Sequence, residues 1–541
     1  MNNSIFKFKE PQNEPIKGYL KGSPEREALV KELKRQSSTE LEIPLIINGK
    51  EVRTGDMKQI RMPHNHKHVL ANYHCATSEN VNEAIESALK AKIEWQRMPW
   101  IERGAILQRA AELFSHKYRA TINAATMLGQ SKNAFQAEID SACELVDFLR
   151  YNAYYAGNIY SDQPKSDATQ LNRMEYRPLE GFIYAISPFN FTSIASNLNF
   201  APIMMGNTSI WKPASTAVLS NYYVAKIYME AGVPAGVFNF LPGSGSVISG
   251  VALKHKSLAG IHFTGSTKTF NYLWKTVGEN LESYTSYPRI VGETGGKDFI
   301  FVHNSACPVE VATNIVRGAF EYQGQKCSAA SRAYIPESLW GEIKKELESQ
   351  VSEIKMGDVN DFENLMAAVI DETSFDKIKS YVDRAKDSKE CEIITGGNCD
   401  KSKGYFIEPT IIKTTNPKYE TMETELFGPV MSIYVYEDKK YEETLELCNS
   451  TSPYALTGSI FGYDRKAVLT AFEKLQYASG NFYINDKPTG ATVGWQPFGG
   501  SRVSGTNDKA GSYLNLVRWT NPRAIKETYL PATYFDYPYM R

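Results

Sequence analysis

The strongest constraint on the fold is an alternation of strand-like and helical segments between residues 180 and 304. Six short runs rich in β-branched and aromatic residues occur there: GFIYAI, TSIWK, VFNFL, AGIHFTG, RIVGE and DFIFV. Helical segments, such as the one from Thr216 to Ala231, separate several of them. Alternation of this kind predicts a parallel sheet covered by helices.

A second set of alternating elements follows residue 305. We expect helices at 308–321, 337–354 and 373–386, and strands at 331–335, 405–412 and 430–436. A chain of 541 residues exceeds one typical domain, which agrees with two α/β lobes.

The segments around the two lobes have other patterns. Ser23, Pro24 and Glu25 predict the start of a surface helix that reaches about Lys34. Residues 43–75 indicate strands and turns, residues 78–157 are mainly helical, and 169–180 alternates like an exposed hairpin. The expected division is a surface segment 1–40, a first lobe 41–304 with a hairpin at about 165–180, a second lobe 305–504, and a tail 505–541 that contacts another subunit.

Charge and cysteine usage exclude several classes of protein. The 60 basic residues nearly cancel the 61 acidic ones, so no nucleic acid or membrane partner is expected. No apolar run approaches the roughly 20 residues of a membrane helix, and the first residues lack the pattern of a leader. Seven scattered cysteines suit a reducing compartment, and we expect the cytoplasm, with the mitochondrial matrix as the alternative.

Cys327, in FEYQGQKCSAASR, is the candidate nucleophile. A thiolate attacks carbonyl carbons well, and aldehyde oxidation needs a nucleophile that converts the carbonyl into a tetrahedral hydride donor. Taken alone, Cys327 could equally be a small buried apolar residue.

Five motifs accompany this cysteine: SPFNF at 187–191, FTGS at 263–266, GETGGK at 292–297, ELFGP at 425–429 and PFGG at 497–500. Their order and spacing resemble the aldehyde dehydrogenase superfamily from about residue 40 to 525. The resemblance implies a Rossmann-type NAD-binding lobe, an α/β catalytic lobe and a small β element for oligomerisation. The longer strings WKPASTA, RIVGETGGKDF, GYFIEPT and GNFYINDKPTGATVGWQPFGG look most similar to the branch that oxidises glutamate γ-semialdehyde, formed from 1-pyrroline-5-carboxylate, to glutamate in proline degradation.

By this resemblance, Asn190 and Glu293 complete the catalytic group. The Asn190 amide would stabilise the oxyanion formed when Cys327 attacks. Glu293 would activate the water that hydrolyses the thioester. Read without the family, Asn190 could be a turn residue and Glu293 a solvated glutamate.

The cofactor site is expected in a variant turn, because no G-x-G-x-x-G motif is present. Gly265 and Ser266 end a strand and a helix starts at about Thr267, where free N–H groups can bind a pyrophosphate. The resemblance implies NAD as cofactor and assigns further contacts to Ser187, Lys212, Ser215, Lys268, Thr269, Glu425 and Phe427. Ser215 is not acidic, so nothing here would repel the extra phosphate of NADP.

Substrate recognition is expected to involve an amino-acid head group. By resemblance, the loop Thr489, Gly490 and Ala491 anchors the α-carboxylate through backbone N–H groups, aided by the Ser328 hydroxyl. Some family members have Ser at the position of Ala491. Phe191 and Phe498 would enclose the aliphatic part, and Glu144 would face the ammonium group, although all three could be ordinary core or helix-surface residues.

Several alternatives stay open at this point. His64, His66 and His68 could suggest a metal site, but the segment reads as a polar loop and no metal is expected. The chain could oxidise another semialdehyde such as succinic semialdehyde, could be a non-catalytic protein on the same fold, or could be a cysteine hydrolase if a histidine partners Cys327. The family further implies a homodimer or larger even assembly and a functional coupling to proline dehydrogenase.

Overall fold

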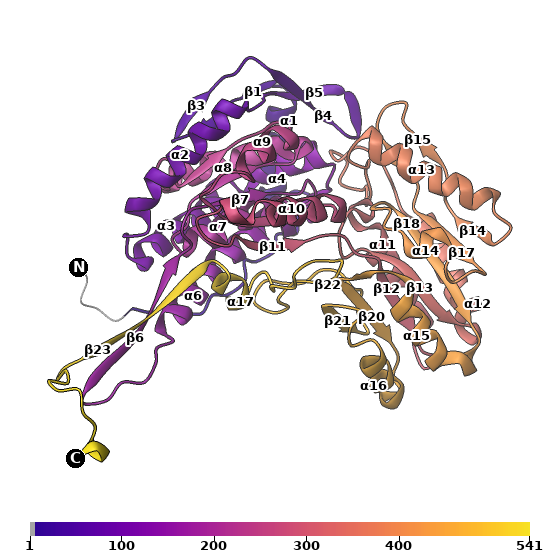
Figure 1. Ribbon diagram of the computed structural model, residues 1–541. Helices are drawn as coiled ribbons and strands as arrows, with labels where there is room; N and C mark the ends of the chain where they lie inside the picture. Colours follow the sequence, from indigo (N-terminus) through magenta and orange to yellow (C-terminus); the bar gives the residue numbers. More distant parts are fainter. Residues whose placement is uncertain (1–5) are drawn as a thin grey trace.

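The computed structural model describes residues 6–541 and contains two seven-stranded sheets and a projecting two-stranded arm (Figure 1). The first sheet has the order β11-β10-β7-β8-β9-β2-β3. Its strands are β2 (Leu45–Ile47), β3 (Lys50–Val52), β7 (Phe182–Ile186), β8 (Ser209–Lys212), β9 (Phe238–Phe240), β10 (Leu258–Thr264) and β11 (Arg289–Glu293). The five strands β7 to β11 are parallel, as predicted, and β2 and β3 extend the sheet in antiparallel pairing.

This strand order is doubly wound. The chain starts in the middle with β7, moves outward through β8 and β9, and then returns to the other side of β7 for β10 and β11. The connecting helices are α7 (Thr192–Met204), α8 (Val218–Ala231), α9 (Gly245–Ala252) and α10 (Thr267–Glu279). In such a sheet, ligands bind at the carboxyl ends of the strands near the point where the order reverses, which here lies between β7 and β10.

The second sheet has the order β14-β17-β18-β13-β12-β20-β21 and only β14 is antiparallel to its neighbour. Its strands are β12 (Asp298–Val302), β13 (Ala330–Pro336), β14 (Cys391–Thr395), β17 (Thr410–Thr414), β18 (Val430–Tyr436), β20 (Thr457–Phe461) and β21 (Asn481–Ile484). Its helices are α11 (Pro308–Phe320), α12 (Glu337–Ser352), α13 (Glu372–Asp387), α14 (Glu420–Glu423), α15 (Tyr441–Thr451) and α16 (Arg465–Lys474). Short pairs β15 (Cys399–Asp400) with β16 (Phe406–Ile407) and β19 (Tyr454–Ala455) with β22 (Ser501–Arg502) complete this lobe.

One strand lies in a different lobe from the one expected. The run DFIFV forms β12, which pairs with β13 and β20 of the second sheet, whereas the sequence division at residue 304 assigned it to the first lobe. A continuous apolar run has the same pattern in either sheet, so periodicity cannot assign it. The chain therefore crosses between the sheets at Thr294–Lys297.

The arm is built from strands that are remote in sequence. β6 (Gln170–Pro178) pairs antiparallel with β23 (Thr520–Thr528) over its whole length, from Gln170↔Thr528 to Pro178↔Thr520. The segment expected as a local hairpin is thus one strand of a ribbon whose other strand comes from the C-terminal tail. Figure 1 shows this ribbon and the exposed aromatic tail projecting away from the lobes.

Helices of the N-terminal half pack on the first sheet, on the helices that connect its strands, or on one another. They are α1 (Pro24–Ser37), α2 (Ser78–Trp95), α3 (Trp100–Glu112), α4 (Arg119–Gln130), α5 (Ala134–Ala137), α6 (Leu145–Ser161) and, from the tail, α17 (Tyr513–Val517), with π-helical turns at Leu113–Lys117 and Glu138–Glu144. A small sheet contains β1 (Leu41–Ile43), β5 (Asn65–His74) and β4 (Met57–Met62). Between residues 6 and 541, no helix combines the length and apolar character needed to span a bilayer.

The segment before α1 is more buried than a surface segment. Ser23 caps α1 as predicted, since its hydroxyl accepts the Arg26 N–H, but Leu29 and Leu33 are buried against α4. Residues 6–22 contain no helix or strand, yet the side chains of Glu14 and Tyr19 are less than a tenth exposed. Residues 1–5 of the expected surface segment lie outside the described part of the chain.

Candidate active site

A cavity of about 330 Å³ lies where the two lobes meet, and most of the predicted catalytic and substrate residues line it. The first lobe contributes Glu144, Phe191 and Glu293. The second lobe contributes Cys327, Ser328, Thr489, Gly490, Ala491 and Phe498. Asn190 and the predicted cofactor residues lie outside the lining of this cavity.

Cys327 lies on an unusual turn just before β13. Three successive residues, Tyr322, Gln323 and Gly324, have φ values of +51°, +53° and +65°. A Cβ on Gly324 would lie 2.3 Å from the carbonyl oxygen of Gly428, so only glycine fits there. The Gln323 amide donates to the Ser131 and Ala368 carbonyls at 2.9 Å each. Strained backbone held by its surroundings in this way is typical of functional sites.

The thiol and the proposed base influence each other electrostatically. Burial raises the pKa of Cys327 well above its usual value, and the negative charges of Asp298, Glu293 and Glu425 add to this effect. Burial also raises the pKa of Glu293, which ends β11 and accepts the Gly500 N–H at 3.3 Å. Glu293 therefore lies in a desolvated site, unlike an ordinary solvated turn glutamate, and is a stronger base than a free carboxylate.

The Asn190 amide is oriented toward the same turn. Its side chain is buried, and Nδ2 donates to the carbonyl oxygen of Gln325 at 3.1 Å, two residues before Cys327. An amide nitrogen has two N–H donors, so one N–H remains for an oxyanion. Asp140 holds the following helix, α7, because its carboxylate accepts the N–H groups of Thr192 and Ser193 at 3.0 and 2.9 Å.

The predicted cofactor residues of the first lobe gather at the carboxyl ends of its parallel strands. Ser187 follows β7 and accepts the Trp211 indole N–H at 2.9 Å. Lys212 is the last residue of β8, and Ser215 follows it in a short 3₁₀ turn. Gly265 and Ser266 follow β10, Ser266 caps α10 by accepting the Thr269 N–H, and Thr267 and Lys268 form its first turn.

These residues fit a bound dinucleotide. Desolvation lowers the pKa of the Lys212 ammonium to about 8, and no salt bridge to it is found among residues 6–541. Hydroxyl groups of a ribose would be suitable acceptors for this ammonium. The N–H groups at the start of α10 point to where a pyrophosphate is expected to bind.

The second lobe supplies Glu425 and Phe427 at the same end. A Glu425 carboxylate oxygen accepts the Gly296 N–H at 2.9 Å, and a Cβ on Gly295 would lie 2.1 Å from that carboxylate. Phe427 has φ +60°, and its ring packs edge-on against Phe189 at 5.7 Å between centroids. Gly295 thus makes room for the Glu425 carboxylate, and Gly296 donates its N–H to that carboxylate.

The substrate end contains the small-residue loop. The hydroxyls of Ser328 and Thr489 are 2.8 Å apart, and Gly490 has φ +97°. Phe498 is held by two backbone hydrogen bonds with Ala510, of 3.0 and 2.8 Å. The structure thus brings Ser328, beside the nucleophile, into contact with the loop that we predict to anchor a carboxylate.

Glu144 is arranged as a neutral acid. The Ser193 hydroxyl lies 2.7 Å from Asp140 Oδ1 and 3.0 Å from Glu144 Oε2, yet it has a single proton to donate. Both contacts are satisfied when Ser193 donates to Asp140 and Glu144 donates to Ser193. Burial, reinforced by Asp140, raises the pKa of Glu144 to about 8, which agrees with this arrangement.

Sequence reasoning missed several residues around the site. Lys132 is buried, donates to Asp140 Oδ2 at 2.7 Å and lies 4.1 Å above the Phe191 ring. Asp298 is buried, and burial raises its pKa to about 8. Its position directly after GETGGK was the only signal. Asn13 and Glu14 line the cavity from the N-terminal segment, for which no sequence signal existed.

The histidines do not support the hydrolase or metal alternatives. His262 lines the cavity, but its Nδ1 lies 2.9 Å from the Leu198 carbonyl oxygen, and burial lowers its pKa to about 3. No histidine among residues 6–541 hydrogen-bonds to Cys327. His64 contacts the Ser131 hydroxyl, while His66 and His68 contact the separate carbonyls of Lys401 and Ser37.

This fold and site define the class of protein. The chain belongs to the aldehyde dehydrogenase family, whose sequence profile matches residues 52–525, and the predicted family and fold class are thereby confirmed.

Relatives are similar over nearly the whole chain. A Delta-1-pyrroline-5-carboxylate dehydrogenase, mitochondrial, from Dictyostelium discoideum is 53% identical over 98% of this chain and 96% of that protein. The crystal structure of the Delta-pyrroline-5-carboxylate dehydrogenase from Mycobacterium tuberculosis bound with NAD matches with a TM-score of 0.96, 48% identity and full coverage of both chains. Proline utilization A (PutA) from Bdellovibrio bacteriovorus matches over 98% of this chain and 54% of that longer chain, with 27% identity and a TM-score of 0.91.

Proposed function

We propose that this protein oxidises L-glutamate γ-semialdehyde, formed from 1-pyrroline-5-carboxylate, to L-glutamate, with NAD as the hydride acceptor. This is the second step of proline degradation. The near full-length similarity to 1-pyrroline-5-carboxylate dehydrogenases, one of them bound with NAD, supports both the substrate and the cofactor.

One geometric observation carries the proposal. The nucleophile Cys327 shares a single cavity with the Thr489–Ala491 loop and Ser328, which provide N–H and O–H donors for a carboxylate. Hydrogen bonds to polar substrate groups discriminate strongly between substrates, because an unsuitable ligand leaves buried donors unpaired. An amino-acid aldehyde therefore fits this cavity better than an apolar aldehyde.

The first chemical step is the attack of Cys327 on the aldehyde carbon. The C–S bond forms, the carbonyl π bond breaks, and Glu293 accepts the thiol proton, for which its raised pKa suits it. The second N–H of Asn190 and the backbone N–H of Cys327 would stabilise the resulting oxyanion. Lys212, Ser266 and Glu425 would hold bound NAD, which supplies the hydride acceptor.

The C–H bond at the tetrahedral carbon then breaks as its hydride leaves for the acceptor, and the carbonyl that re-forms is a thioester, which water hydrolyses. Once Glu293 has released the thiol proton to solvent, it removes a proton from a water molecule, whose oxygen forms a bond to the acyl carbon, and the C–S bond breaks. Cys327 recovers a proton as the thiol, which is its stable form in this buried and negatively charged site. The products are the carboxylate and the free enzyme.

The test is an absorbance assay of reduced cofactor. The purified protein is mixed with 1-pyrroline-5-carboxylate and either NAD or NADP, with Cys327→Ala and succinic semialdehyde as controls. NADH formation that the variant lacks would support the mechanism and the substrate together. Activity with succinic semialdehyde alone would overturn the substrate, and no activity with any aldehyde would overturn the enzyme assignment.

Assembly, partners and location are parts of the same proposal. The projecting ribbon of β6 and β23 and the exposed aromatic tail support a homodimer or larger even assembly (Figure 1). The match to proline utilization A supports a functional coupling to proline dehydrogenase. All seven cysteines are free, which agrees with a reducing compartment: the cytoplasm, or the mitochondrial matrix that the name of the D. discoideum relative supports.

A further inference from the structure

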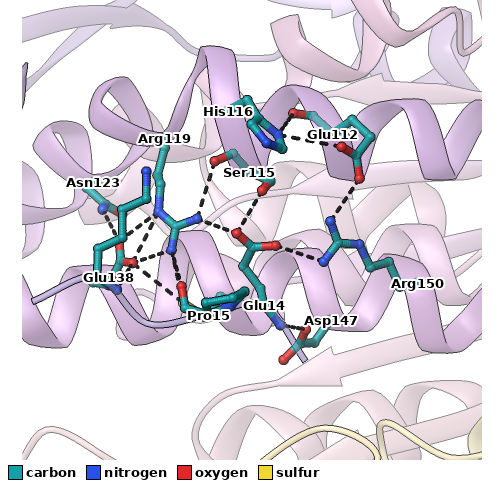
Figure 2. Close-up of polar contacts among 12 residues, drawn as sticks. Glu14, Pro15, Glu112, Ser115, His116, Arg119, Asn123, Glu138, Asp147 and Arg150 are labelled. Atoms are coloured by element: carbon teal, nitrogen blue, oxygen red, sulfur yellow. Dashed lines mark hydrogen bonds and ion pairs between the residues drawn. The ribbon is translucent and has the colours of Figure 1, made fainter. Parts of the chain in front are cut away.

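Residues 10–22, which we call the N-terminal strap, are pinned to the first lobe by buried charges (Figure 2). The Glu14 carboxylate pairs with Arg119 and, at 2.8 Å, with Arg150, and it accepts the Ser115 hydroxyl at 2.7 Å. The Glu14 N–H donates to Asp147 Oδ1 at 2.7 Å. Because breaking a buried ion pair leaves an uncompensated charge, these contacts hold the strap firmly in place.

Asn13, next to this anchor, joins the strap to two other parts of the chain. Its Nδ2 donates to Asp147 Oδ2 and to the Val493 carbonyl oxygen, both at 2.8 Å. Its Oδ1 accepts the Trp495 indole N–H at 2.9 Å. Both amide N–H groups and the amide oxygen are therefore used, which fixes the orientation of the side chain.

The segment that Asn13 holds is the continuation of the proposed carboxylate anchor. Gly490 and Gly494 have φ values of +97° and +84°, so this loop contains two positions whose backbone conformation favours glycine. Ser328 holds its beginning through Thr489, and Asn13 holds its end through Val493 and Trp495. Asn13 also lines the cavity itself, together with Cys327 and the loop.

We propose that Asn13 is a positioning residue for substrate recognition: the N-terminal strap sets the place of the 489–493 loop and hence of the N–H groups that take the substrate carboxylate. The inference rests on the proposed function, because it assigns the loop to the α-carboxylate of an amino-acid aldehyde. Asn13 holds the recognition loop and does not position the thiol, the base or the cofactor residues. We therefore expect its replacement to change substrate affinity and to leave the chemical step unchanged.

The test compares Asn13→Ala with Gln12→Ala, a matched control that removes the neighbouring exposed amide. Steady-state kinetics are measured with glutamate semialdehyde and with propanal, which has no carboxylate. Asn13→Ala is expected to raise KM for glutamate semialdehyde about five- to tenfold, the effect of one or two lost hydrogen bonds, with kcat and the KM for NAD unchanged. Values for propanal, and all values for Gln12→Ala, are expected to match the wild type.

A second variant protects the test against misfolding. Trp495→Phe keeps an aromatic ring at an exposed position and removes only the N–H that Asn13 accepts. It is expected to raise the same KM by a smaller factor. An unchanged KM in both variants, or a loss of kcat that is equal for both aldehydes, would overturn the inference while leaving the proposed function intact. A wild type that oxidises propanal but not glutamate semialdehyde would instead overturn the proposed function, and the inference with it.

Discussion

Replacing Arg119 by methionine is expected to destabilise the first lobe in a strongly pH-dependent way. Arg119 lies between two carboxylates, Glu14 and Glu138, and all three side chains are less than a tenth exposed (Figure 2). Glu14 keeps Arg150 and Ser115 in the variant, whereas Glu138 loses its cation. Glu138 would retain the Tyr19 hydroxyl, the Asn123 amide and the Lys17 N–H as donors.

The expected loss of unfolding free energy follows from the way in which the variant can avoid a buried, unpaired Glu138 carboxylate. Burial alone would raise the pKa of Glu138, but its hydrogen bonds and ion pair with Arg119 hold it below its usual value. Without Arg119, the cheapest native state has Glu138 protonated. With an ordinary pKa near 4.3 and about 1.36 kcal/mol per pH unit, protonation costs about 3.7 kcal/mol at pH 7 and about 1 kcal/mol at pH 5. The first value agrees with the roughly 3–5 kcal/mol found when one partner of a buried pair is removed.

The wild type behaves differently over this range. Since the folded-state pKa of Glu138 is lowered, the ion pair contributes its full stability above the unfolded pKa, and this contribution is lost only as pH falls through the folded value. Between pH 5 and 7, the contribution of Glu138 to the unfolding free energy of the wild type is therefore nearly constant. Only the variant is expected to change in stability over this range.

The assay is urea unfolding followed by tryptophan fluorescence at pH 7 and pH 5. The matched control is Arg150→Met, which also removes a partner of Glu14 but leaves Arg119 in place, and whose second partner Glu112 is 59% exposed. We expect the control to cost less than Arg119→Met at pH 7 and to depend little on pH, because Glu14 keeps Arg119 as its cation. An equal loss of unfolding free energy at pH 5 and at pH 7 in Arg119→Met would show that Glu138 is not neutralised by protonation in the variant. That result would refute the reasoning.

Three further predictions concern the site. Asn190→Ala is expected to lower kcat about 10²- to 10³-fold, the usual effect of removing one oxyanion donor, measured by NADH formation at saturating substrate; a fall below tenfold would contradict the role. Glu144 has a raised pKa of about 8, so its contribution to stability is full below the unfolded pKa and is lost as pH rises through about 8. Glu144→Gln keeps a neutral group at every pH, and its melting temperature is expected to rise relative to the wild type between pH 6 and 9; parallel curves would argue against a neutral Glu144. Ser215→Glu is expected to reduce kcat/KM for NADP at least about tenfold, with little change for NAD, because a carboxylate repels the 2′-phosphate; equal effects on both cofactors would place Ser215 elsewhere.

Elements whose signals are local were predictable from the sequence. The run VMSIYVY forms β18 over the expected residues 430–436, and α11 spans Pro308–Phe320 against an expected 308–321. Pro308 at the first helical position and an apolar face at helical spacing are sufficient for the second case. The turn between β10 and α10 was predictable for the same reason, because Ser266 is both a cap and the end of a strand motif.

Features that depend on distant partners were not predictable. β6 alternates as a strand does, but its partner β23 lies over 340 residues away, so a local hairpin was the natural expectation. Glu14 has no periodic context, and its cation partners Arg119 and Arg150 are 105 and 136 residues away. A lone glutamate in a Pro- and Asn-containing segment is normally exposed, and these two cations make its burial possible.

The crossing between the lobes connects fold and chemistry. Glu293 ends β11 of the first sheet and Asp298 begins β12 of the second, so the segment between them passes directly through the active site. A Cβ on Gly296 would lie 2.3 Å from the carbonyl oxygen of Cys327, and the Gly296 N–H binds Glu425. This close packing sets the relation of base to nucleophile without involving the 489–493 loop. The loop is instead held by Ser328 and the N-terminal strap. Because separate contacts position the reacting groups and the recognition loop, a change at Asn13 can alter KM while kcat is preserved.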